Sequence, residues 1–178
     1  IEIHYSGFMS MFKKYLSYLL PIKLESEIGQ DNVPLEVYYD QGKIKLFTKT
    51  TNYSGGKLKS MFRKALKLEY FKERNHVLVL GFGLGSIWEI IKSEKKQNPY
   101  IYGVDYEPLM KKFIHTYNPN ILKDPKTHLY INDALTYLKT DKQCYDYILI
   151  DLFFDNTVAD VVLQPNFIEE LFKHSHIR

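Results

Sequence analysis

The segment that most constrains the fold spans residues 76–88 and reads HVLVLGFGLGSIW. Its apolar run, residues 77–80, has the length and composition of a strand buried on both faces. Three glycines follow at alternate positions, Gly81, Gly83 and Gly85, and a helical pattern follows them. A glycine turn lets a ligand approach the main chain, and a helix start offers unpaired N–H groups. Strand, glycine turn and helix in this order therefore predict an α/β fold with a nucleotide site.

Strands and helices alternate along the rest of the chain. Such alternation is typical of a doubly wound parallel sheet with helices on both faces, which is a Rossmann-like α/β fold. The predicted strands are 76–80, 100–105, 128–131 and 145–150, and the predicted helices are about 86–96, 108–117, 134–139 and 165–174.

A small extension precedes this core. Apolar residues at helical spacing predict a helix over 8–20, and two strand-like runs around Asp40-Gln41-Gly42 predict a hairpin over 35–48. Residues 52–56 have the composition of a flexible connection. We therefore expect two domains, an N-terminal helix and β-hairpin extension at 1–56 and a Rossmann-like domain at 57–178.

Charge and cysteine content bound the partners and the compartment. The net charge of +3, from 24 basic and 21 acidic residues, does not indicate a nucleic-acid-binding protein. The predicted helix at 57–74 carries a mostly basic outer face, which leaves an RNA or an anionic substrate open beside a plain solvated face. Because Cys144 is the single cysteine and no apolar run reaches about 20 residues, we expect a cytoplasmic protein without a membrane segment.

Carboxylates follow three of the predicted strands, where an open parallel sheet binds its ligands. Asp105 ends the second strand, where a carboxylate can accept both hydroxyls of a ribose. Asp133 follows the third strand, where it can accept from the amine of a base or simply cap the next helix. Asp151 and Asp155 follow the fourth strand and would face the reacting end of the ligand. For each of them a solvated loop residue is the alternative.

These motifs resemble the S-adenosylmethionine-dependent transferases with the seven-stranded methyltransferase fold, and within them spermidine synthases and their methyltransferase-like relatives. The hairpin also resembles the small N-terminal β-domain of spermidine synthases, so that the resemblance covers roughly residues 35–172. It is carried by the segments 77–85, 103–108, 132–134 and 145–151.

The resemblance implies a role for each motif residue. The three glycines would wrap the methionine part of S-adenosylmethionine or of its decarboxylated form, Asp105 would hold the ribose, and Asp133 would contact the adenine. Asp151 matches the residue that accepts a proton from the attacking amine in aminopropyl transfer. Catalytic roles are thus expected for Asp151 and Asp155, and cofactor binding for Gly81, Gly83, Gly85, Asp105, Tyr106, Glu107, Asp133, Ala134 and Asp151; no metal site is expected.

The sequence also departs from spermidine synthases. Leu84 stands where they carry an Asp, no counterpart of their Tyr-His-Glu motif precedes the core, and Asp155 lies one residue late and lacks a following Pro. A dicationic diamine needs several carboxylates around it when it is buried. The departures therefore favour an S-adenosylmethionine-dependent methyltransferase acting on an unidentified small acceptor, with an aminopropyltransferase using decarboxylated S-adenosylmethionine as the alternative.

Two other classes remain. A nicotinamide-dependent oxidoreductase would use the glycines and Asp105 too, but Ser86 occupies the last position of its glycine motif. A non-catalytic relative that kept the fold is the other. The resemblance also implies C-terminal strands after the helix at 165–174, so we expect the full-length protein to continue. The open sheet edge makes a homodimer possible.

Overall fold

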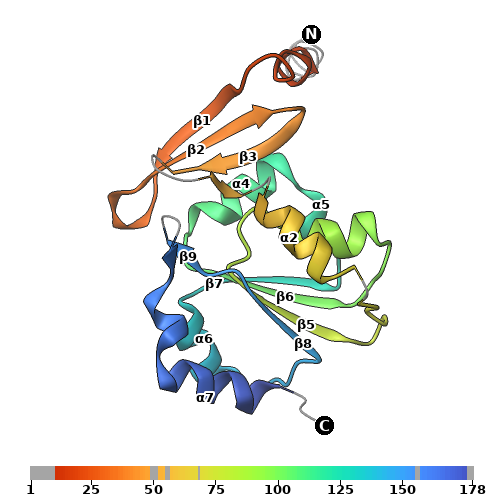
Figure 1. Cartoon of the computed structure of the whole chain (residues 1–178), viewed down its shortest axis with the longest axis vertical. Coiled ribbons are helices and arrows are strands. Elements are labelled where there is room, and N and C mark those ends of the chain that lie inside the picture. The colour runs from red at the N-terminus through yellow and green to blue at the C-terminus, as the bar shows by residue number, and fades with distance from the viewer. Residues whose placement is uncertain (1–10, 49–51, 55–56, 68, 155–156, 176–178) are drawn as a thin grey trace. The chain divides into compact units, whose positions relative to one another are not determined.

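The computed structural model describes residues 11–48, 52–54, 57–67, 69–154 and 157–175. Contacts within the chain divide it into two compact units, Ile1–Gly55 and Gly56–Arg178 (Figure 1). The parts of the fold that position the candidate site all belong to the second unit.

The first unit is an antiparallel meander that follows a short helix. Residues 11–16 are helical, and the part of the predicted helix before them lies outside the described residues. The strands lie in the order β1-β2-β3-β4. Their bounds are Ile22–Ile28 (β1), Pro34–Asp40 (β2), Lys43–Phe47 (β3) and Asn52–Ser54 (β4), with a 3-10 turn, η1, at Gln30–Asn32.

The predicted hairpin is confirmed as β2 and β3. Asp40 pairs with Lys43, which leaves Gln41 and Gly42 as a two-residue loop with φ of 50° and 72°. Two successive positive φ angles are typical of a type I′ turn, which matches the twist of paired strands. The prediction of a flexible connection was wrong for residues 52–54, which pair with β3 as β4; residues 55–56 lie outside the described residues.

The second unit contains the predicted parallel sheet. The strand order is β7-β6-β5-β8, and every neighbouring pair is parallel. This confirms a doubly wound α/β fold. The strands are His76–Leu80 (β5), Tyr100–Asp105 (β6), Thr127–Ile131 (β7) and Tyr147–Ile150 (β8), and a two-stranded hairpin follows β8 at Phe153–Phe154 (β9) and Thr157–Val158 (β10).

Helices cover both faces of this sheet, with α2, α4 and α5 on one face and α6 and α7 on the other in Figure 1. A core cluster on the second face joins Leu78, Leu80 and Val104 to Leu138 and Phe167. Because side chains alternate along a strand, Val77 and Val79 of β5 point to the opposite face. The helices are Lys57–Ala65 (α2), Ser86–Trp88 (α3), Glu89–Glu94 (η2, a π-helical turn), Leu109–Tyr117 (α4), Asn120–Lys123 (α5), Ala134–Thr140 (α6), Asp160–Leu163 (η3, a 3-10 turn) and Pro165–His174 (α7).

The prediction of one helix over 57–74 was wrong beyond Ala65, where α2 ends. Lys95 directly follows η2. Its ammonium group donates to the carbonyl oxygens of Leu66 and Glu69. A lysine that takes carbonyls just past a helix end replaces the N–H partners that a further turn would supply.

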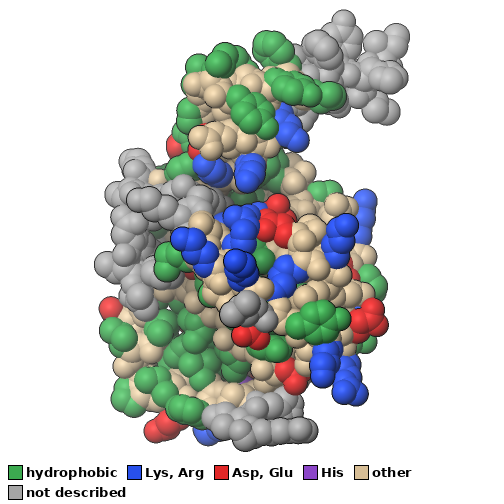
Figure 2. Space-filling model, turned by 45° about the vertical axis from the view of Figure 1, so that its right-hand side comes forward, with side chains coloured by type: hydrophobic (Ala, Val, Ile, Leu, Met, Phe, Trp, Pro, Cys, Tyr) green, Lys and Arg blue, Asp and Glu red, His purple; other side chains and the backbone are tan. Residues whose placement is uncertain are grey.

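The basic face of α2 is partly neutralised. Lys59 pairs with Glu89 and Glu94, and the Arg63 guanidinium donates to both carboxylate oxygens of Glu94 at 2.7 Å. Figure 2 shows Lys and Arg side chains on this face of the molecule with acidic side chains among them.

Within the described residues no helix combines the length and the apolar character that a bilayer crossing needs.

Candidate functional site

The strand order places a topological switch point, hereafter the crevice, at the carboxyl ends of β5 and β8. The chain runs from β5 to β6 and β7 on one side and then returns to β8 on the other side of β5. Adjacent connections therefore leave the sheet in opposite directions, which is where open α/β sheets bind ligands. Gly81 follows β5 and Asp151 follows β8, and the Asp151 N–H donates to the Leu80 carbonyl at 2.7 Å.

The first two glycines of the loop differ in the space around their Cα atoms. Gly81 has a φ of 84°, and a Cβ there would lie 2.1 Å from the Asp151 carbonyl oxygen. Gly83 has a φ of 52°, yet no heavy atom lies within 4 Å of the position that its Cβ would take. Gly81 therefore lets two loops pack together, whereas Gly83 faces open space that a ligand can occupy. Gly85 packs against Ile121 and precedes α3.

Asp105 joins the glycine loop to the end of β6. Its carboxylate is buried, with Oδ2 accepting from the Gly83 N–H at 2.7 Å and Oδ1 accepting from the Glu107 N–H at 3.0 Å. Burial raises the pKa of Asp105 to about 6, although the two hydrogen bonds oppose this shift. Glu107 is buried as well, and its Oε1 accepts from the Leu109 N–H at 3.0 Å.

Asp151 has a carboxylate oxygen without a partner. Its Oδ1 is the one buried side-chain nitrogen or oxygen atom with no hydrogen bond in the part of the chain that the structure describes. Burial, and secondly the negative charge of Asp105, raise the pKa of Asp151 to about 7. Because buried polar atoms are nearly always paired, an orphaned acceptor beside a glycine crevice is suited to a donor group of a ligand.

The other predicted residues lie in different settings. Asp133 caps α6, because its Oδ1 accepts from the Thr136 N–H at 2.8 Å; its contact with an adenine stays a prediction. Ala134 is buried at the first residue of α6, and Tyr106 is about half exposed after β6. Asp155 lies outside the described residues, as do the side chains of Phe153 and Phe154.

Sequence reasoning missed a close contact between Phe82 of the glycine loop and Gly103 of β6. Gly103 lies inside β6, and a Cβ there would lie 2.2 Å from the Phe82 ring. Phe82 is buried between the glycines and fixes the loop against the strand. A glycine in the interior of a predicted strand was the available signal, since such a glycine often marks a close approach.

The switch point, the glycine loop and the carboxylates after β6 and β8 are the features of a Rossmann-like domain with the fold of S-adenosylmethionine-dependent transferases. The sequence model of the spermine/spermidine synthase domain matches residues 64–175, which is more than half of the chain. The chain therefore belongs to the spermine/spermidine synthase family.

Curated proteins and solved structures are also similar to this chain. The polyamine aminopropyltransferase of Saccharolobus solfataricus is 28% identical over 111 residues, which are 60% of this chain and 37% of that protein. Spermidine synthase from Thermotoga maritima has the same fold, with a TM-score of 0.57 at 16% identity, over 86% of this chain and 53% of its own. A probable spermidine synthase from Corynebacterium glutamicum gives 0.63 at 12% identity, over 85% and 60%. The chain thus spans little more than a third of this curated relative and slightly more than half of these solved structures.

The expectation of a methyltransferase was wrong, because the family match and the curated relatives point to aminopropyl transfer. It rested chiefly on Leu84. The second unit keeps two acidic residues at the glycine loop, Asp105 and Asp151, and the buried Glu107 lies two residues after Asp105. One missing carboxylate therefore leaves the region strongly acidic, and a single side chain weighs less than a match over residues 64–175.

Proposed function

We propose that this protein transfers an aminopropyl group from decarboxylated S-adenosylmethionine to an amine acceptor, with Asp151 as the base that receives the amine proton. The observation that carries the proposal is the buried, unpartnered Oδ1 of Asp151 at the end of β8. The family to which the chain belongs supports the reaction class. The chain spans only part of the length of the relatives it matches, so the activity is proposed from the family and from the site together.

The residues divide the work of binding. Gly83 leaves room for the donor against the main chain, and the Asp105 carboxylate lies beside it, because it accepts from the Gly83 N–H. The donor carries a sulfonium and an ammonium group, and buried carboxylates favour such cations over neutral ligands. Decarboxylated S-adenosylmethionine fits this setting because it brings positive charge to an acidic crevice.

The chemistry asks little more of the protein than alignment and one proton transfer. When bound, the donor supplies a carbon that its sulfonium makes electrophilic. The acceptor's nitrogen lone pair forms a bond to this carbon, the carbon–sulfur bond breaks with its electrons going to sulfur, and a proton leaves the nitrogen. Asp151 Oδ1 is suited to take that proton, because a base with a pKa near 7 is partly deprotonated at neutral pH and still binds protons well.

The test is a product assay with decarboxylated S-adenosylmethionine and a set of mono-, di- and triamines. Mass spectrometry follows the new amine and the released methylthioadenosine. We expect Asp151→Asn to lower kcat by about 10²–10⁴-fold, as is typical when a positioned base is removed. Calorimetry with methylthioadenosine should show binding by this variant within a few-fold of the native protein, because the product needs no base.

The matched control is Asp160→Asn, which makes the same change at an exposed position of η3. It should leave kcat unchanged. Full turnover by the Asp151→Asn variant would contradict the role of Asp151, and the absence of any aminopropylated product with every amine would contradict the reaction itself.

A further inference from the structure

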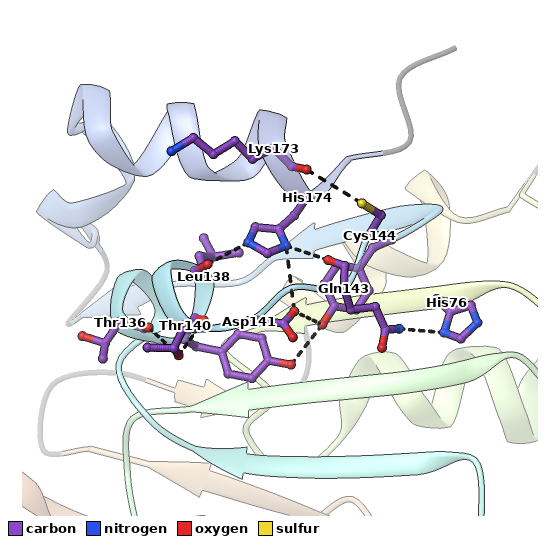
Figure 3. Close-up of polar contacts among 11 residues, drawn as sticks. His76, Thr136, Leu138, Thr140, Asp141, Gln143, Cys144, Lys173 and His174 are labelled. Atoms are coloured by element: carbon purple, nitrogen blue, oxygen red, sulfur yellow. Dashed lines mark hydrogen bonds and ion pairs between the residues drawn. The ribbon is translucent and has the colours of Figure 1, made fainter.

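A second polar cluster lies at the other end of the sheet. It is formed by the C-terminal ends of α6 and α7 and by the turn that precedes β8. Figure 3 shows His174, the last residue of α7, among Leu138, Asp141 and Gln143. The His174 side chain is buried, with only 5% of the residue exposed. None of these residues belongs to the crevice at the carboxyl ends of the strands.

Both ring nitrogens of His174 face backbone carbonyl oxygens. Nδ1 lies 2.6 Å from the Gln143 carbonyl oxygen, and Nε2 lies 2.7 Å from the Leu138 carbonyl oxygen. A carbonyl oxygen only accepts hydrogen bonds, and a neutral imidazole has a single N–H to donate. Both contacts can be hydrogen bonds only if the ring carries both protons.

A counter-charge is present. Asp141 Oδ2 lies 3.8 Å from Nδ1 of His174, and the same oxygen accepts from the Tyr145 hydroxyl at 2.6 Å. Tyr145 in turn shares a hydrogen bond of 3.0 Å with the Tyr137 hydroxyl. Burial raises the pKa of both tyrosines, that of Tyr137 to about 12, so both stay neutral. Asp141, the residue after α6, is the acidic side chain that faces the ring.

The remaining charged groups near the ring belong to the helices themselves. Glu170 lies one turn before His174 on α7 and interacts with it electrostatically. Glu170 also pairs with Lys173 at 2.8 Å, and Lys139 of α6 acts on the same carboxylate. The acidic side chains that act on the ring are therefore Asp141 and Glu170.

The main chain at His174 is tied to the same place. The Tyr145 N–H donates to the His174 carbonyl at 2.7 Å, and Ser175 forms a parallel bridge with Tyr145. We propose that His174 is a buried imidazolium that latches the end of α7 to α6 and to the turn before β8, and that loss of one ring proton releases the latch.

This latch has a consequence for the crevice. The chain between Asp151 and α7 consists of β9, β10 and η3, and α6 begins directly after Asp133. Holding the far ends of α6 and α7 together thus limits the movement of both segments that lead away from the crevice. His174 is a positioning residue in this scheme, and it lies at the opposite end of the strands from Asp151.

Nitrogen-15 NMR of the histidine side chains tests the proton count directly in the native chain. We expect both ring nitrogens of His174 to carry protons at about pH 7, with slow exchange because the ring is buried. The signal is assigned by its loss in His174→Gln. A ring with one unprotonated nitrogen at this pH would overturn the proposal, whether or not any variant folds.

Hydrogen exchange and melting test the latch. His174→Gln should lower Tm by about 5 °C and increase amide exchange in α7, because a buried charged donor is lost. The difference from the native chain should shrink as pH rises, since only the doubly protonated ring supplies both bonds. The matched control is His115→Gln, on the exposed side of α4. It should leave both Tm and amide exchange in α7 unchanged. Unchanged exchange in α7 of His174→Gln would overturn the latch.

Discussion

At the scale of single residues, burial disfavours the charged form of Asp151 in the folded state. Its folded pKa of about 7 lies above the ordinary value of about 3.9 for an unfolded Asp. Between these two values the folded state holds a proton that the unfolded state has lost. The free energy of unfolding therefore falls as pH rises from about 4 to 7, which is the opposite of the usual salt-bridged carboxylate.

Replacing Asp151 by Asn should remove this penalty. We expect Asp151→Asn to be more stable than the native chain at about pH 8, by on the order of 2–4 kcal/mol, and to match it near pH 4. Urea unfolding at a series of pH values measures the difference. The exposed Asp160→Asn serves as the control and should follow the native curve. A less stable Asp151→Asn variant at pH 8 would show that the carboxylate has partners in solution.

Gly81 and Gly83 should respond differently to the same substitution. Gly83→Ala adds a methyl group into open space at a φ of 52°, so we expect a cost of about 1–2 kcal/mol from the left-handed backbone alone. Gly81→Ala also clashes with the Asp151 carbonyl and should cost several kcal/mol more. Binding of methylthioadenosine, measured by calorimetry, should be lost in Gly83→Ala although the protein stays folded. Native affinity in that variant would show that the ligand does not approach Gly83.

At the scale of elements, local patterns predicted what local interactions determine. The run Val77–Leu80 and its glycines gave β5 and its turn, and the alternation that follows gave β6, β7 and β8. The end of α2 was beyond such reasoning, because the donor to the carbonyls that follow it is Lys95, almost 30 residues further along the chain. β1 was missed because a register shift between Lys23 and Glu25 breaks its alternation.

For the site as well, local sequence patterns predicted some features, whereas contacts between distant segments decided others. Asp105 and Asp151 could be predicted, because their place depends only on where a strand ends. The bond from the Gly83 N–H to Asp105 and the orphaned oxygen of Asp151 could not, since both depend on how two loops pack.

The lysine that ends α2 gives a test at this scale. Lys95→Met leaves the Leu66 and Glu69 carbonyls without their charged donor. Because a hydrogen bond to a charged group contributes about 1.5–3 kcal/mol, we expect a loss of that order in urea unfolding. Lys111→Met, at an exposed position of α4, is the control and should lie within about 0.5 kcal/mol of the native chain. Equal stability of the two variants would mean that water replaces Lys95 at no cost.

At the scale of the whole molecule, the two raised carboxyl pKa values couple ligand charge to pH. Asp105 and Asp151 lose their protons around pH 6 and 7, so the acidic region gains negative charge across this range. A cationic ligand and a neutral ligand of the same shape should therefore respond differently to pH. Decarboxylated S-adenosylmethionine is such a cation, and methylthioadenosine is its uncharged counterpart.

Melting of the full chain with each ligand measures this coupling. The rise in Tm that decarboxylated S-adenosylmethionine produces should grow as pH increases from about 5.5 to 8, with affinity changing by up to about tenfold per pH unit for each linked proton. The rise produced by methylthioadenosine should stay nearly constant, because it brings no charge to the carboxylates. In Asp151→Asn one titrating group is gone, so the growth with the cationic ligand should weaken while the neutral ligand behaves as before. Identical pH profiles for the two ligands would mean that the charge of Asp105 and Asp151 does not act on the donor, and the acidic crevice would then select its ligand by shape alone.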